Sequence, residues 1–158
     1  MFQRYENNPI LESNSDNEFE KDYTYNPATI VHDGKVYMIY RAEGKWNGRH
    51  VSSLCLATSE DGYNFKRYKN NPVIVPDRPE EHKGCEDPRI TKIGDTFYMT
   101  YTAFESEDKN GINIALSLAT SKDLVNWEKH GKIIDNTKAG YILPWKIDNE
   151  YKMLVGVG

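Results

Sequence analysis

Short runs of alternating apolar and polar residues recur along the chain, and turn-forming residues separate them. Val51 to Ser59 alternates in this way between two sets of side chains, and a period of two is typical of a β-strand. No segment carries a sustained apolar stripe at i, i+3 and i+4, so we expect little helix. The pattern predicts ten strands, at residues 28–32, 35–42, 51–59, from about 65, 89–93, 96–104, 113–121, 127–134, 141–147 and 151–155.

The strand pattern repeats along the chain at a nearly constant offset. The segment that begins at Pro27 recurs from Pro88, and residues 54–61 recur in the same order as residues 116–123. Asp33-Gly34 separates the first two strands as a two-residue turn, which suits a type I′ hairpin. Four short antiparallel strands in each repeat are typical of a β-propeller blade.

The repeats predict an all-β fold, a partial β-propeller domain over residues 1–158. The blades are expected at residues 26–86 and 87–140, with an incomplete third at 141–158. A propeller needs about four to eight blades to close its ring. The chain is therefore expected either to be the N-terminal part of a longer protein or to self-associate through its open blade edge.

Composition and charge narrow the class of protein. The chain has 158 residues, 38% of them hydrophobic, with 3 Trp, 11 Tyr and 5 Phe, which is enough for a folded core. It has no apolar run long enough to span a membrane and no secretory signal. A net charge of −4 argues against a nucleic-acid partner. We expect a cytoplasmic protein.

The cysteines and histidines point to no cofactor site. Cys55 and Cys85 lie far apart without a CxxC motif, and the four histidines show no metal-ligand spacing. Reduced thiols are the favoured interpretation. No metal and no organic cofactor is expected.

Candidate chemistry gathers where the first strand of each blade begins. Asn26 precedes a proline there, and Glu86 and Asp87 precede Pro88 and Arg89. Arg89 can hold one carboxylate ionised, while burial raises the pKa of the other toward the range of a general acid. In the structural alternative, Asp87 caps a strand and pairs with Arg89, and this alternative fits the spacing at least as well.

The run Gly84-Cys85-Glu86-Asp87-Pro88-Arg89-Ile90, preceded by Asn26-Pro27 and Tyr40-Arg41-Ala42, resembles the β-mannoside phosphorylase family, glycoside hydrolase family 130. Further matches lie at residues 54–62 and 119–128. The resemblance covers essentially the whole chain, but only about the first half of a family member. It implies a five-bladed β-propeller.

The resemblance also implies a reaction, the inverting phosphorolysis of β-mannosides to mannose 1-phosphate. Asp87 resembles the general acid, which in the family is thought to act through a sugar hydroxyl. Inorganic phosphate is already an anionic nucleophile, so no second carboxylate is needed to activate water. The expected partners are an oligosaccharide substrate and phosphate, which is a co-substrate.

Other site residues are implied in the same way. Asn26 would hydrogen-bond the sugar, and Arg41 would meet phosphate with its planar guanidinium. Lys146 matches a lysine of the family, and Glu86 and Arg89 complete the set of expected substrate-binding residues.

Each assignment has a structural alternative. Asn26 can be a turn former, and Arg41 can pair with Glu43 or Asp61. Asp61 and Asp123, each in a Ser-x-Asp turn, are expected to be structural. Phe65 and Trp127 occupy equivalent blade positions and are expected in the core.

Two other functions remain open. The family usually shows a His-Arg pair where this chain has Val155-Gly156, and that histidine contributes to the phosphate site. A β-mannoside hydrolase is therefore the alternative within the family. A half-propeller that only binds glycan or assembles with itself is the non-enzymatic alternative.

Overall fold

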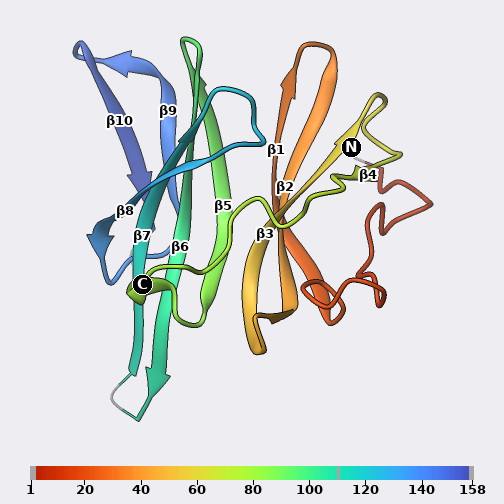
Figure 1. Ribbon diagram of the computed structural model, residues 1–158. Helices are drawn as coiled ribbons and strands as arrows, with labels where there is room; N and C mark the ends of the chain where they lie inside the picture. The colour runs from red at the N-terminus through yellow and green to blue at the C-terminus, as the bar shows by residue number, and fades with distance from the viewer. Residues whose placement is uncertain (1–2, 110, 157–158) are drawn as a thin grey trace.

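The computed structural model describes residues 3–109 and 111–156, and almost all of its regular structure is strand (Figure 1). One 3-10 turn, η1 (Pro79–Glu81), lies between the fourth and fifth strands. No helix in these residues is long and apolar enough to cross a membrane. The strands are β1 (Tyr23–His32), β2 (Lys35–Trp46), β3 (Arg49–Ser59), β4 (Lys66–Arg67), β5 (Gly84–Ile93), β6 (Thr96–Asp108), β7 (Gly111–Ser121), β8 (Glu128–Asp135), β9 (Gly140–Ile147) and β10 (Glu150–Val155).

The strands form three groups in chain order, β1–β4, β5–β8 and β9–β10, here named blades 1, 2 and 3. Within each group, neighbouring strands pair antiparallel. A single parallel bridge between Ser52 and Gly84 joins blade 1 to blade 2. The first strands contact one another in a row, β1 against β5 and β5 against β9. This is the arrangement of innermost strands around a propeller channel.

The ten predicted strands are all present, but the first strand of each full blade begins earlier than the pattern indicated. β1 starts at Tyr23 and β5 at Gly84. A β-bulge interrupts each ladder, between Tyr25 and Ala28 in β1 and between Glu86 and Arg89 in β5. The bulge breaks the period of two, which is why the pattern placed the strand starts after it.

The predicted hairpin turn has the expected backbone. Asp33 and Gly34 both have positive φ, at 47° and 78°, as a type I′ turn requires. Asp148 and Asn149, at 52° and 63°, repeat this geometry between β9 and β10.

The main core lies between blades 1 and 2. Ile39 and Leu54 from blade 1 pack with Met99 and Tyr101 from blade 2, and Trp127 covers this cluster. A second, smaller core forms where the N-terminal segment covers blade 1. Its contributors are Met38, Tyr40, Ala42, Cys55 and Ala57, with Ile10, Leu11, Phe19 and Phe65 packed against them.

A buried ionic cluster ties the outer strand of blade 1 to its second strand. The Glu20 carboxylate is fully buried and accepts a 2.8 Å hydrogen bond from the Tyr40 hydroxyl. Arg67 Nε, on β4, lies 2.9 Å from the same carboxylate. The carboxylate therefore has both a neutral and a charged donor, which a buried charge requires.

The same cluster recurs in blade 2. Glu81 is fully buried and accepts a 2.7 Å hydrogen bond from the Tyr101 hydroxyl. Lys129, on β8, supplies the cation. Glu81 and Tyr101 occupy the positions in the second repeat that Glu20 and Tyr40 occupy in the first. Blades 1 and 2 are thus each fastened to the segment that leads into their first strand.

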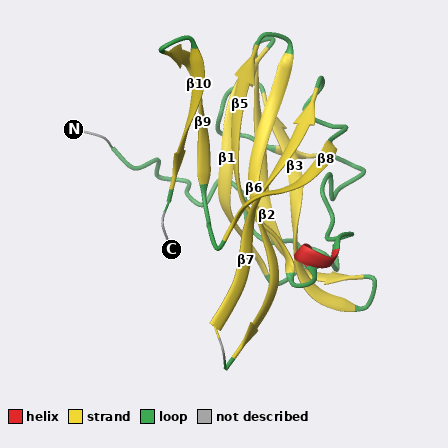
Figure 2. Ribbon diagram, turned by 90° about the vertical axis from the view of Figure 1, so that its left-hand side faces the viewer, coloured by secondary structure: helices red, strands yellow, loops and turns green. Residues whose placement is uncertain are grey.

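Blade 3 consists of β9 and β10 alone, and Figure 2 shows this hairpin beside the longer strands of blade 2. It carries a set of exposed apolar side chains, namely Tyr141, Trp145, Ile147, Tyr151, Leu154 and Val155. These side chains leave blade 3 with exposed apolar surface that is suited to further packing.

Candidate active site

The side chains of Asn26 and Asp87 meet across the junction between the first strands of blades 1 and 2. Both residues sit in the β-bulges and have left-handed backbones, with φ of 48° and 49°. A bulge re-aims a side chain, and Asn and Asp tolerate this conformation. As a result, Asn26 Nδ2 donates a 2.8 Å hydrogen bond to Asp87 Oδ1. Ala139, just before β9, repeats the conformation with φ of 47° but brings only a methyl group.

Gly84 allows the two blades to approach closely enough to form this site. Its φ is 149°, and a Cβ there would lie 2.7 Å from the backbone nitrogen of Ser52. Only glycine fits such a position. The close approach brings Arg41 and Ser52 of blade 1 against Glu86 and Asp87 of blade 2.

The Arg41 guanidinium lies among these groups. Its Nη2 is 2.8 Å from Glu86 Oε1, and its Nη1 is 3.5 Å from Asp87 Oδ1. Its Nε donates a 2.9 Å hydrogen bond to Ser52 Oγ. Arg41 thus links both carboxylates of the Glu86-Asp87 pair to blade 1.

Tyr25 and Glu43 hold the other side of Arg41. The Tyr25 ring centroid is 4.5 Å from the guanidinium carbon, and the Tyr25 hydroxyl donates to Glu43. Glu43 Oε2 is also 3.4 Å from Arg41 Nη2. Burial and the bond to Glu43 raise the pKa of Tyr25, so it remains a neutral donor.

The two adjacent carboxyl groups differ in exposure. The Glu86 side chain is 4% exposed, whereas the Asp87 side chain is 20% exposed. Burial raises the pKa of Glu86, and the neighbouring Arg41 charge opposes that rise. Among the described residues, hydrogen bonds and ion pairs of Asp87 involve Oδ1 only. Its Oδ2 is left available to carry a proton or meet a ligand.

Two of the expected site residues lie apart from this cluster. The Arg89 guanidinium donates a 2.9 Å hydrogen bond to the carbonyl oxygen of Pro88. Lys146 lies near the β9–β10 turn, with its ammonium 5.5 Å from the ring centroid of Tyr151. The structure therefore brings together Asn26, Arg41, Glu86 and Asp87, but neither Arg89 nor Lys146 contacts them.

Ser52, Tyr25 and Lys138 are site residues that the sequence reasoning did not identify. Lys138 is exposed, and its charge acts on Glu86, lowering the pKa of that carboxyl against the effect of burial. It immediately precedes the left-handed Ala139, just as Glu86 precedes Asp87. Aligning the three repeats at Asn26, Asp87 and Ala139 places Lys138 opposite Glu86. The sequence of the third repeat differs too much from the other two for this alignment to be evident.

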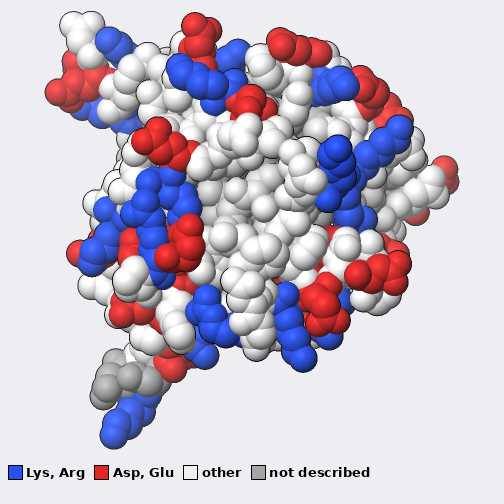
Figure 3. Space-filling view, viewed as in Figure 1, with Lys and Arg blue, Asp and Glu red and all other residues white. Residues whose placement is uncertain are grey.

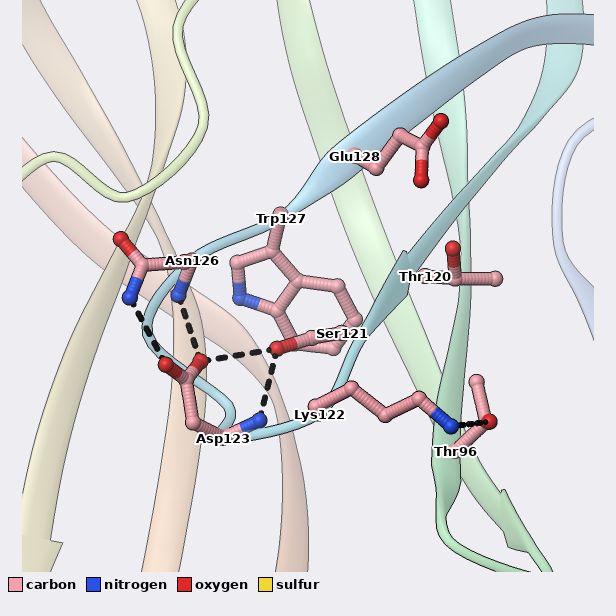
Figure 4. A pocket seen from close by; sticks show the side chains of 8 residues that line it. All are labelled: Thr96, Thr120, Ser121, Lys122, Asp123, Asn126, Trp127 and Glu128. Carbon is pink, nitrogen blue, oxygen red and sulfur yellow. Dashed lines mark hydrogen bonds between the residues drawn. The ribbon is translucent and has the colours of Figure 1, made fainter.

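A cavity of about 420 Å³ lies away from this cluster, at the turn between β7 and β8 (Figure 4). Ser121, Asp123 and Asn126 close that turn with hydrogen bonds. Burial would raise the pKa of Asp123, but the donors of Asn126 and Val125 outweigh it and lower the pKa to about 2. Blade 1 has the same turn at residues 59–64, so we interpret it as a structural element of the blade.

The face shown in Figure 3 has no continuous stripe of side chains of one charge, either positive or negative. Acidic and basic side chains are interspersed there around an uncharged central area. Nucleic-acid binding would require a basic stripe.

The sequence matches a known protein family over almost its whole length. The family described as beta-1,4-mannooligosaccharide phosphorylase matches residues 2–158. The chain belongs to glycoside hydrolase family 130. The fold of this family is a five-bladed β-propeller, of which the chain supplies about half.

Two curated relatives of the family come from Thermoanaerobacter sp. (strain X514). A 1,2-beta-oligomannan phosphorylase is 38% identical over 157 residues, which cover 96% of this chain and 52% of the relative. A beta-1,2-mannobiose phosphorylase is 37% identical over 161 residues, with coverages of 94% and 52%. The chain thus spans about half the length of these relatives.

A solved structure of the family has the same fold. It superposes with a TM-score of 0.85 at 33% identity, over 99% of this chain and 53% of its own. It comes from work describing glycoside hydrolases within this family of mannoside phosphorylases that target β-1,2-mannosidic linkages in Candida mannan.

Proposed function

We propose that this chain carries the general acid and part of the sugar and phosphate site of an inverting β-mannoside phosphorylase. The observation that carries the proposal is the contact of Asn26 and Arg41 with Asp87 across the blade junction. These three are among the residues that the family resemblance implied, whereas Arg89 and Lys146, which it also implied, lie apart. In the sequence they stand far apart, in two different repeats.

In the proposed reaction, a phosphate oxygen attacks the anomeric carbon of the mannosyl residue. The glycosidic C–O bond breaks, and the leaving oxygen takes the proton of Asp87, relayed through a sugar hydroxyl. Inversion of a β-linkage gives α-mannose 1-phosphate and a shortened sugar. Because phosphate is already an anion, the site needs cations rather than a second carboxylate as base. We propose Arg41 and the exposed Lys138 as these cations.

We propose β-1,2-linked mannosides as the substrates. The two curated relatives at 38% and 37% identity are named for β-1,2 linkages, although the family description names β-1,4. The transfer of a mannosyl group to phosphate would make the protein a glycosyltransferase in the broad sense. The buried, free thiols of Cys55 and Cys85 support a cytoplasmic location.

Hydrolysis of the same linkages is the alternative. Val155 and Gly156 stand where the resemblance implied a histidine and an arginine, so an expected phosphate ligand is missing. The solved relative from work on β-1,2-specific hydrolases also supports this alternative. Water would then replace phosphate as the nucleophile.

The test is incubation with β-1,2-mannobiose in the presence and absence of phosphate, with mannose 1-phosphate and mannose measured separately. We expect mannose 1-phosphate only with phosphate, and none with Asp87→Asn. Free mannose released at the same rate without phosphate would establish hydrolysis instead. Sugar binding without turnover would support the non-enzymatic alternative.

We also propose that the chain self-associates through its open blade edge in blade 3, where Trp145 and Leu154 are exposed at 57% and 61%. Sedimentation over a range of concentrations should show an assembly larger than 18.3 kDa. Substitution of both residues by serine should return it to a monomer. A monomer at every concentration would refute this part of the proposal.

A further inference from the structure

The Arg41 guanidinium contacts buried side chains as well as Asp87. On its buried side, Nε donates to Ser52 Oγ at 2.9 Å and Nη2 lies 2.8 Å from Glu86 Oε1. The Ser52 hydroxyl donates in turn to Glu86 Oε1, at 3.5 Å. The three side chains therefore form a closed ring of polar contacts.

Two members of this ring, Ser52 and Glu86, are inaccessible to a sugar. Ser52 and Glu86 are each 3% exposed, and both lie beneath Arg41. Only Nη1 of the guanidinium is directed to Asp87, whose side chain is 20% exposed. The buried ring thus ends at Asp87, whose carboxylate is partly exposed, as is that of Glu43 on the other side of Arg41.

We propose that Glu86 and Ser52 are positioning residues that fix the Arg41 guanidinium against Asp87. This inference rests on the proposed function, in which Asp87 is the general acid. Glu86 is not a sugar ligand, contrary to what the family resemblance suggested. It acts through Arg41.

The consequence for Asp87 follows from its contacts. Asn26 Nδ2 and Arg41 Nη1 both contact Asp87 Oδ1, at 2.8 Å and 3.5 Å. Two donors occupy the lone pairs of Oδ1, so the geometry leaves Oδ2 as the oxygen that can carry the transferable proton. If Arg41 rotates away, Oδ1 loses one of its two donors and the proton is no longer confined to one oxygen.

The first test measures the Arg41 Nε–H group by ¹⁵N NMR of the whole chain, with the signal assigned by its loss in Arg41→Lys. We expect Ser52→Ala to raise its exchange with water by about tenfold, the effect of losing a hydrogen bond to a charged group. Glu86→Gln should raise it by a smaller factor, because the amide oxygen still accepts from Nη2. Ser53→Ala is the matched control, since the neighbouring Ser53 is also buried but its hydroxyl has no partner among the described residues. Exchange within about twofold of the control in both variants would overturn the proposal.

The second test separates positioning from substrate binding. In phosphorolysis of β-1,2-mannobiose, Ser52→Ala should lower kcat about tenfold. Glu86→Gln should lower kcat by a smaller factor, and both should leave KM nearly unchanged. A raised KM with unchanged kcat in Glu86→Gln would show that Glu86 binds substrate, and would overturn the proposal. A chain without any phosphate-dependent activity would contradict the proposed function. The exchange rates would still decide whether Ser52 and Glu86 hold Arg41.

Discussion

Replacement of Lys129 by methionine should strongly destabilise blade 2. The Lys129 side chain is 10% exposed and supplies the cation paired with Glu81, whose carboxylate is fully buried. After the change, the carboxylate keeps only neutral donors, the Tyr101 hydroxyl at 2.7 Å and the backbone N–H groups of Asp77 and Arg78 at 3.2 and 3.3 Å. A buried charge that loses its partner costs about 3–5 kcal/mol.

The loss can be measured by urea unfolding and by a thermal melt followed by circular dichroism. At about 2–4 °C per kcal/mol for a chain of this size, Tm should fall by roughly 6–20 °C. Lys132→Met is the control, because Lys132 lies on the same strand and pairs with Asp135, but at 55% exposure. An exposed pair of this kind contributes little to stability, because solvent screens the attraction between the two charges.

Two outcomes separate the effect of burial from that of charge alone. Equal losses in Lys129→Met and Lys132→Met would refute the idea that burial makes the Glu81 cluster important. Lys129→Arg should retain most of the stability, because Arg67 fills the same role in blade 1. This variant keeps the test usable if Lys129→Met does not fold.

Two further predictions concern the blade junction and the blade turns. Gly84→Ala should cost about 1–3 kcal/mol and weaken the site, because its Cβ would meet Ser52 at 2.7 Å. Gly111→Ala, where φ is also positive but the space is open, should cost less, and an equal loss in urea unfolding would contradict the close-approach argument. Asp123 has a folded-state pKa of about 2, below its ordinary value of 3.8. Its ionised form therefore stabilises the fold above about pH 4. This contribution to stability is lost as the pH falls toward 2. The stability gap between the native chain and Asp123→Asn should therefore close over that range, and a gap independent of pH would contradict the prediction.

The blade architecture could be predicted because its signals are local or periodic. Alternation with a period of two requires only that one face of each strand be buried. The constant offset that relates Pro27 to Pro88 requires only that the blades be built alike. The motif at residues 84–90 then identified the family and singled out Asp87, which lies at the centre of the site.

The site itself was only partly predictable. Asn26, Arg41, Glu86 and Asp87 were all expected, and they do lie together. Which of them touch, however, follows from two β-bulges that the alternating pattern cannot show. Neither Ser52 nor Tyr25 stands in a motif, so no sequence signal marked either of them as a partner of Arg41.

The sequence by itself therefore determined the strands, the repeat and the family, since each depends on residues close together or evenly spaced in the chain. The tertiary structure decided which side chains work together. Gly84 admits a close approach between blades, and the left-handed Asn26 and Asp87 turn their side chains into the junction. Lys146 does not contact these side chains, because β9 carries it toward the β9–β10 turn, where its ammonium lies near Tyr151. Such contacts depend on how whole strands are placed, which no local pattern of residues encodes.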